Sequence, residues 1–309
     1  MRRGLALALL LVPGLNDAAT YALPPPGASL VGEIAYETTA HEDTLIDVAR
    51  RRRVGYEELV MANPSVDRWL PGEGTQVIVP TRYILPSGPR KGIVVNLAEY
   101  RLYYYPKTKR GSAPVVETYA VSAGRDDWQT PQHAVTFIRQ RLRNPAWYPP
   151  KSIRREHAAA GDPLPAVVPP GPDNPLGPLA LQLAIPGGYF IHGTSKAFGI
   201  GMSVTHGCLR LYPEDMAALF ERVPVNTPVR IVNEPYKAAL EDGVLYLEAH
   251  PGGEPGEPRP NDEDLVRASF ERALTGRGDY AVEWADIEAT VLQPRGVPVP
   301  VPRRAAAPG

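Results

Sequence analysis

The sequence of 309 residues contains one cysteine, Cys208. A chain with a single thiol cannot form an internal disulfide. A glycine-rich phosphate-binding loop is also absent, which removes the common nucleotide-binding motifs. The formal net charge is −1, so the chain as a whole does not attract nucleic acid or an anionic membrane surface. We therefore expect no nucleic-acid partner.

Long apolar runs are scarce as well. Residues 1–22 begin with Met-Arg-Arg, continue as a short apolar run to Val12 and end in small residues at Ala22. This pattern is typical of a secretory signal peptide, and the run is too short to span a bilayer. A buried N-terminal strand is the alternative. No cysteine follows the run, which excludes a lipoprotein anchor, so we expect an exported protein that does not span the membrane.

Residues 30–82 form the first predicted domain. Thr44 can cap a helix with apolar residues at helical spacing, and a second short helix starts near Tyr56 and ends at Asn63. A strand is expected over 77–79, and residues 31–36 can supply its partner. The four arginines at 50–53 point in different directions on a helix, so we interpret them as a solvated face rather than an anion site.

The order strand–helix–helix–strand, with D-T-L, A-N-P and G-x-x-V-x-V-P in these places, resembles a LysM domain. This resemblance implies binding of the N-acetylglucosamine-containing glycan of cell walls. The glycine usual before D-T-L is Glu42 here. A packing domain that binds nothing is the alternative. As a separate binding module, residues 23–85 should be removable without loss of the chemistry carried by the rest of the chain.

Residues 91–234 change to short strands. A hairpin is expected over 92–105, with its turn at 96–99. Further strands are predicted within 115–124 and from 134, and around 179–183, 189–192 and 228–233. One helix starts near Pro213. Thirty-six prolines also suit short strands and ordered loops. Strands at this spacing indicate a β-sandwich-like domain.

Residues 235–309 form a C-terminal extension. A linker rich in proline and glycine follows His250, helices are predicted over 263–275 and 280–292, and the Pro-rich tail should be extended or disordered. The expected fold class is therefore α+β and mainly β. It combines a β-sandwich-like central domain, a small β-α-α-β domain and a short helical C-terminal extension.

The residues around Cys208 in the sequence are the candidates for a catalytic site. The thiol follows Thr205-His206-Gly207, and a second His-Gly pair stands at His192-Gly193. An imidazole near the thiol can take its proton and leave a nucleophilic thiolate. An inert core cysteine is one alternative. A zinc site from the two histidines and the thiol is another, although it lacks a C-x-x-C pair and an obvious fourth ligand.

The stretches IHGT at 191–194 and FGIGMSVTHGCLR at 198–210 together resemble the signature of the L,D-transpeptidase (YkuD-type) catalytic domain. The resemblance implies that Cys208 is the nucleophile and that His192 is the general base and later acid. The Gly193 carbonyl would orient the His192 ring. The layout over residues 23–250 is similar to periplasmic enzymes that link Braun-type lipoprotein to peptidoglycan.

The same resemblance assigns supporting roles. His206, Gly207 and Cys208 would form a tight turn whose N–H groups make an oxyanion hole, and Gly207 would let the backbone approach the substrate. Arg210 would hold a substrate carboxylate or stiffen the loop. His206 and Arg210 could also merely brace the turn.

The implied reaction is an acyl transfer in peptidoglycan metabolism. The thiolate would cleave the diaminopimelate–D-alanine bond of a tetrapeptide stem, form a thioester and pass the acyl group to a lipoprotein lysine or to another diaminopimelate. No metal or organic cofactor is needed, because the thioester conserves the acyl activation. Water as acceptor would give an L,D-carboxypeptidase or a hydrolase that releases lipoprotein, and a wall-binding scaffold without catalysis is the alternative from another class.

Overall fold

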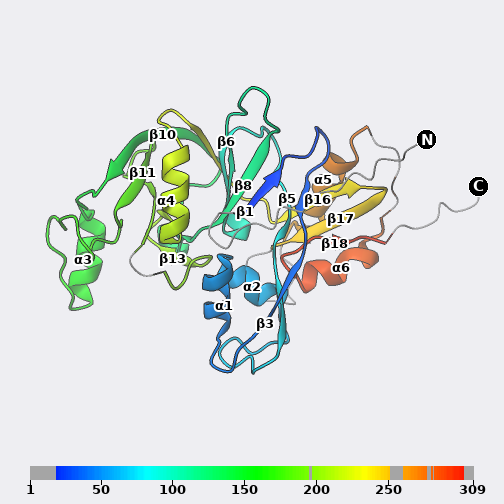
Figure 1. Cartoon of the computed structure of the whole chain (residues 1–309), viewed down its shortest axis with the longest axis horizontal. Coiled ribbons are helices and arrows are strands. Elements are labelled where there is room, and N and C mark those ends of the chain that lie inside the picture. Colours follow the sequence, from blue (N-terminus) through cyan, green and yellow to red (C-terminus); the bar gives the residue numbers. More distant parts are fainter. Residues whose placement is uncertain (1–18, 195–196, 251–259, 277–279, 281, 303–309) are drawn as a thin grey trace, which may run out of the picture.

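A nine-stranded mixed sheet forms the centre of the computed structural model, which describes residues 19–194, 197–250, 260–276, 280 and 282–302 (Figure 1). The strand order is β1 (Ala19–Ala22), β8 (Val115–Ala120), β7 (Arg101–Tyr105), β6 (Gly92–Asn96), β15 (Pro228–Val232), β10 (Ala134–Arg143), β11 (Leu179–Leu183), β12 (Phe190–His192) and β14 (Leu209–Arg210). The mainly-strand character and the predicted hairpin over 92–105 are confirmed.

The sheet bends at β10. The first part of this strand, Ala134–Phe137, pairs with β15, whereas Ile138–Arg143 pairs with β11 after a shift of register. The expected sandwich of two separate sheets is therefore seen as one sheet with two halves, because the ten-residue β10 belongs to both. Helix α4 (Pro213–Arg222), which starts where it was predicted, lies beside β10 and β11 (Figure 1).

Alternation along β6 fixes what covers each face of the first half. Ile93 and Val95 point into the main core, which also contains Met216 and Leu219 of α4. Val94 points the other way, into a second cluster that contains Tyr83 from the N-terminal part of the chain. A strand buried on both faces needs a near-continuous apolar run, which Gly-Ile-Val-Val provides.

The N-terminal unit has the predicted order of β3 (Ala35–Thr38), α1 (Leu45–Arg52), α2 (Tyr56–Ala62) and β4 (Gln76–Val79), with β3 and β4 antiparallel. The Thr44 hydroxyl accepts from the Asp47 N–H at 3.3 Å, and the Asp47 carboxylate accepts from the Thr44 N–H at 2.9 Å. This reciprocal cap starts α1. A second pair, β2 (Leu30–Gly32) with β5 (Arg82–Ile84), leads into the central sheet.

The arginines of α1 are not simply a solvated face. They do point in different directions, and Arg51 binds Glu37 and Asp43 within the unit. Two of them reach α4, however. Arg50 lies 2.7 Å from Glu214, and Arg53 lies 3.0 Å from the buried Asp215. These contacts hold the N-terminal unit against the catalytic part of the chain.

The C-terminal extension contains more strand than the sequence analysis expected. Helices α5 (Asp262–Leu274) and α6 (Trp284–Leu292) confirm the two predicted helices. They pack on a missed sheet of β16 (Tyr236–Glu241), β17 (Val244–Ala249) and β18 (Val299–Pro300), with a core of its own. The two helices of the extension were therefore predicted, whereas its three-stranded sheet was missed. Most of the predicted linker and the last seven residues lie outside the described residues.

Five short elements complete the fold of the described residues. These are β9 (Ala123–Gly124), which pairs in parallel with β13 (Ser203–Thr205), the 3-10 turns Leu97–Glu99 and Asp126–Trp128, and helix α3 (Lys151–Ala159), which the sequence analysis treated as loop. Helix α3 belongs to the long connection between β10 and β11 and lies at one end of the molecule (Figure 1). In the described part of the chain, no helix combines the length and apolarity that a bilayer crossing requires.

The predicted signal peptide lies mostly outside the described residues. Its last four residues form β1, which pairs with β8 from Ala19 opposite Thr118 to Ala22 opposite Val115. The Tyr21 hydroxyl donates to the Thr81 carbonyl at 2.9 Å. Residues 19–22 therefore belong to the folded sheet.

Candidate active site

Parallel pairing of β12 with β14 brings the two His-Gly motifs together. Ile191 lies opposite Leu209, and His192 lies opposite Arg210. Ile191 and Leu209 both point into the main core. Since side chains alternate along a strand, His192, Arg210 and the adjoining Cys208 leave on the opposite face. The strand pairing therefore gathers the expected nucleophile, the expected base and the arginine on one side of the sheet.

His192 is buried and its ring is fixed by the backbone. Its Nδ1 lies 2.5 Å from the Gly193 carbonyl oxygen, the contact that the family resemblance implied. Because a carbonyl only accepts, Nδ1 carries the proton and Nε2 keeps its lone pair. Burial lowers the pKa of His192 to about 4, and the charge of Arg210 acts in the same direction. The ring is therefore neutral at pH 7 and can accept a proton.

Cys208 is half-buried at the start of β14. Burial raises the pKa of its thiol, although a backbone hydrogen bond with Phe190 and the charge of Arg210 act to lower it. These two pKa shifts favour a thiol at Cys208 and a neutral imidazole at His192, and not a preformed pair of thiolate and imidazolium.

A network of hydroxyl contacts shapes the turn before Cys208. The Thr205 hydroxyl donates to the Cys208 carbonyl at 2.6 Å and accepts from the Gly207 N–H at 3.2 Å. The Thr130 hydroxyl donates to the Gly207 carbonyl at 2.9 Å. Of the three N–H groups expected to form an oxyanion hole, that of Gly207 is therefore already bonded within the turn.

Gly207 is required by its backbone and by its neighbours. Its φ of 95° lies in the region that favours glycine, and a Cβ there would come within 2.8 Å of the Tyr189 ring. The same atom would lie 3.3 Å from the Gln129 carbonyl oxygen. The turn can hold Cys208 in this place only because residue 207 has no side chain.

The His206 side chain contacts helix α3. Its Nε2 lies 2.8 Å from a carboxylate oxygen of Glu156 on α3, and the Trp128 ring meets it edge-on with ring centroids 5.1 Å apart. The other Glu156 oxygen binds Arg125. These hydrogen bonds, first from Arg125 and then from His206, lower the pKa of Glu156. His206 therefore ties the nucleophile turn to α3.

The zinc alternative does not fit this arrangement. A shared ion would need the donor atoms of His192, His206 and Cys208 to converge. Among the described residues, these three are not a group whose donor atoms gather in this way. Within the described ranges, the one trio of such residues whose donor atoms gather within 4.8 Å consists of Glu99, Glu248 and His250. That trio already surrounds the Lys237 ammonium group, which binds both carboxylates at 2.8 Å.

Arg210 offers a cationic group with unused hydrogen-bonding capacity. Its backbone exchanges two hydrogen bonds with Ser122, of 2.8 Å and 3.0 Å, which fixes its position beside β9. Its Nε atom is buried, and the described residues provide no hydrogen-bond partner for it. Burial lowers the pKa of the guanidinium, although it remains charged. This geometry suits a carboxylate ligand better than a purely bracing role.

Sequence reasoning missed three residues that shape the site. Glu156 was missed because its contact with His206 spans fifty positions, so that no local sequence pattern indicates the contact. Thr130 was missed for the same reason, since it lies 77 positions from Gly207. Thr205 was within the quoted motif but received no role, although a threonine before a tight turn commonly bonds the backbone of that turn.

Comparisons with known proteins identify the family. The family model described as the L,D-transpeptidase catalytic domain, YkuD, matches residues 90–231. The Escherichia coli K12 protein named Probable L,D-transpeptidase YcfS is 39% identical over 298 residues, covering 94% of this chain and 91% of that protein. The one named Probable L,D-transpeptidase ErfK/SrfK, also from Escherichia coli K12, is 42% identical over 248 residues, covering 79% of this chain and 78% of its own length.

Solved structures give a weaker likeness. The crystal structure of an Enterococcus faecium L,D-transpeptidase mutant aligns with 46% of this chain and 50% of that chain, with 20% identity and a TM-score of 0.35. The assignment rests instead on the relatives that match over most of their length. With the family model matched across both His-Gly motifs, the chain belongs to the YkuD-type L,D-transpeptidases.

Proposed function

We propose that this L,D-transpeptidase acts on peptidoglycan stems through a thioester on Cys208, with His192 as its base. The observation that carries the proposal is the parallel pairing of β12 and β14, which puts His192, Arg210 and Cys208 on one face of the sheet. The buried His192, whose Nδ1 bonds the Gly193 carbonyl, and the thiol are the residue types that nucleophilic catalysis by cysteine uses, which supports the proposal.

The first half of the reaction acylates the enzyme. His192 Nε2 accepts the thiol proton while sulfur attacks the carbonyl carbon of diaminopimelate, the third stem residue. The imidazolium then gives that proton to the leaving amine, and D-alanine departs as the thioester forms. The low pKa of His192 makes its imidazolium a strong acid for this second transfer.

The second half returns the enzyme to its starting state. An amine attacks the thioester carbonyl and gives a proton to His192, which returns it to sulfur as the new amide forms. The N–H of Cys208 is our candidate for the oxyanion contact, because the Gly207 N–H is engaged by Thr205. Arg210 would hold the free carboxylate of the stem through its guanidinium group.

The N-terminal unit is proposed to bind wall glycan, as its likeness to LysM implies. Trp69 and Leu70 are 57% and 80% exposed, and Tyr36 of the same unit is 58% exposed. The Asp67 carboxylate accepts from the N–H groups of Trp69 and Leu70, at 2.8 Å and 2.9 Å, and so fixes the loop that presents them. Exposed aromatic rings on a rigid loop are suited to sugar faces.

The acceptor and the compartment follow from the same proposal. A lipoprotein lysine or a second diaminopimelate supplies the amine, and both the substrate and the acceptor lie in the periplasm. Export would use the signal peptide predicted at the N-terminus. Because β1 starts at Ala19, we expect N-terminal sequencing of the mature protein to begin at or before that residue, and not at Leu23.

Mass spectrometry of purified sacculi tests the proposal. Sacculi from wild-type, deletion and Cys208→Ala strains are compared for attached lipoprotein, 3→3 crosslinks and trimmed tripeptide stems. We expect one transfer product to disappear equally in the deletion and Cys208→Ala strains. Loss of tripeptides alone would identify the hydrolytic alternative. Unchanged products with the folded Cys208→Ala protein would favour the wall-binding scaffold and contradict catalysis.

A further inference from the structure

A cavity of about 570 Å³ lies where the N-terminal unit, the central sheet and the C-terminal extension meet. Helix α2 supplies Glu57, Glu58 and Met61, and the central part supplies the turns around Tyr100 and Gln129. The volume falls within the range of sites for peptides and small molecules. Neither Cys208 nor His192 lines it, so the cavity is distinct from the site described above.

The cavity is close to the nucleophile turn through one of its walls. The paired strands β9 and β13 contribute Gly124 and Ser203 to the lining. Strand β13 ends at Thr205, three residues before Cys208, and Thr130 of the lining donates to the Gly207 carbonyl at 2.9 Å. The wall of the cavity is therefore the same structure that holds the nucleophile in place.

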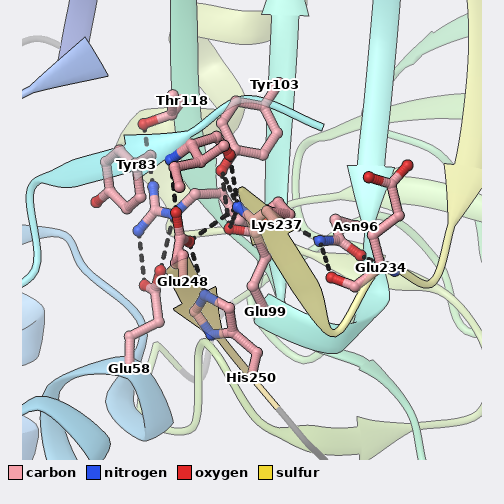
Figure 2. Close-up of polar contacts among 12 residues, drawn as sticks. Glu58, Tyr83, Asn96, Glu99, Tyr103, Thr118, Glu234, Lys237, Glu248 and His250 are labelled. Atoms are coloured by element: carbon pink, nitrogen blue, oxygen red, sulfur yellow. Dashed lines mark hydrogen bonds and ion pairs between the residues drawn. The ribbon is translucent and has the colours of Figure 1, made fainter. Parts of the chain in front are cut away.

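The cavity is also preformed, because buried ion pairs fix its base. The Glu58 carboxylate binds the Arg101 guanidinium at 2.6 Å and 2.8 Å, and both side chains are buried. Figure 2 shows Glu99 and the His250 ring in the same network around Lys237 and Glu248. Backbone contacts add to this rigidity, since the Tyr56 N–H donates to the Ile200 carbonyl at 2.9 Å.

The charges of the lining are of one sign. Its acidic residues are three glutamates, and it contains one histidine but no lysine or arginine. Two of the carboxylates are neutralised, since Glu58 binds Arg101 and Glu99 binds Lys237. In the described part of the chain the third, Glu57, has no side-chain hydrogen bond or ion pair. Burial raises its pKa, and the charge of Arg68 acts weakly against this. A half-buried carboxylate without a partner suits a cationic ligand group.

We propose that this cavity binds the peptide that accepts the acyl group, with Glu57 holding a cationic group of that peptide. The inference rests on the proposed acyl transfer, whose acceptors are amine-bearing peptides. The side-chain amides of Gln129, Gln132 and Asn233 in the lining can bond peptide groups, and Met61 and Met202 provide adaptable apolar surface. The donor stem would instead lie at Arg210.

Transfer kinetics with purified Glu57→Gln enzyme test the proposal. The donor is a tetrapeptide stem, and the acceptors are a lysyl-lysine dipeptide, which has a second cationic group, and methylamine, which has none. We expect KM for the dipeptide to rise about 2- to 5-fold, the effect of one partly exposed charge pair, with a larger rise for Glu57→Lys. The rise should shrink at high salt. KM for methylamine and the acylation rate of Cys208 should not change.

The exposed Glu33 of the same unit gives the matched control, because Glu33→Gln removes an equal charge away from the cavity. An unchanged dipeptide KM in both Glu57 variants, with normal thermal stability, would overturn the proposal. An equal rise in the dipeptide KM for Glu33→Gln would mean that only the overall charge matters, and would contradict binding of the peptide by Glu57. Failure of the wild-type enzyme to form any Cys208 adduct by intact mass would instead refute the acyl-transfer mechanism itself.

Discussion

Glu58 of α2 and Arg101 of β7 form an ion pair of 2.6 Å between the N-terminal unit and the central sheet, and each side chain is only 2% exposed. The Arg101 guanidinium also stacks on the Tyr83 ring, 4.1 Å from its centroid, and binds the Thr118 hydroxyl at 3.0 Å. Two buried charges that neutralise each other across a boundary make the two units depend on one another.

Removing one partner of this ion pair should therefore destabilise the folded protein. We expect Glu58→Gln to lower the free energy of unfolding by about 3–5 kcal/mol, because the Arg101 charge would remain buried without compensation. Urea unfolding followed by fluorescence measures this value. Glu263→Gln, which breaks the exposed pair with Arg267 on α5, is the control and should cost under about 0.5 kcal/mol. Similar losses in both variants would contradict the structural role of the buried pair.

The same contacts argue against the expectation that residues 23–85 can be removed without consequence. Deletion would leave Arg101 unpaired and would uncover Tyr103 and Val116, which pack against Val31 and Tyr83. We now expect the deleted protein to lose acylation by a carbapenem together with its cooperative unfolding. A deletion variant that unfolds cooperatively and is acylated at the wild-type rate would show that the unit is an independent module.

Substitution of Gly207 can be compared with substitution of Gly111 as its control. Gly207→Ala places a Cβ within 2.8 Å of the Tyr189 ring at a φ of 95°, so the turn must shift and displace Cys208. Gly111 has a similar φ of 83° but nothing within 4 Å of the added atom. Both substitutions should cost about 1 kcal/mol of backbone strain. Only Gly207→Ala should also lower the rate of Cys208 acylation, by at least about tenfold if the thiol moves by about 1 Å.

Stopped-flow acylation by a β-lactam separates these outcomes. Equal acylation rates for the two alanine variants would mean that the turn tolerates the clash without moving the thiol. Loss of acylation in Gly111→Ala would point to a general effect on the fold.

The two histidines should differ in the acylation step. His192→Ala should lower the acylation rate by about 10²–10⁴, the usual range for loss of a general base. His206→Ala should cost less, because its ring is bound to Glu156 and not directed to the thiol. Glu156→Gln should then behave like His206→Ala and unlike His192→Ala. A larger loss for His206→Ala than for His192→Ala, with both proteins folded, would reverse the assignment.

Features encoded by neighbouring residues could be predicted from the sequence. The Thr44 cap of α1, the start of α4 at Pro213 and the hairpin over 92–105 follow from capping, proline and alternation. The two His-Gly motifs could be read as a site because their spacing is a family signature. Each of these signals lies within about 20 residues, so no knowledge of the packed fold is needed.

Features that depend on distant pairing were not predictable in this way. The bend of β10, the Glu58–Arg101 pair and the Glu156–His206 contact arise only when the sheet has formed. The missed hairpin of β16 and β17 is different, because its signal was present. Asp242 and Gly243 have φ of 49° and 78°, as in a tight two-residue hairpin turn, but the run Lys-Ala-Ala-Leu-Glu before them favours helix.

The buried, neutral state of His192 makes stability depend on pH. Its pKa is lowered to about 4 in the folded protein, whereas an unfolded histidine titrates near 6.5. Between these values the unfolded chain binds a proton that the folded protein does not bind. The free energy of unfolding should therefore fall as the pH falls from about 6.5 to about 4, by about 1.4 kcal/mol per unit. Roughly 2 kcal/mol of this loss lies between pH 7 and pH 5.

Comparison with His192→Gln isolates this effect from the carboxylates, which titrate in both proteins. We expect the wild-type protein to lose about 2 kcal/mol relative to the variant between pH 7 and pH 5, as measured by urea unfolding. Parallel curves for the wild type and His192→Gln would mean that His192 takes up its proton in the folded protein near pH 6.5. The imidazole would then not be held neutral by burial, and the resting thiol–imidazole pair inferred for Cys208 and His192 would be wrong.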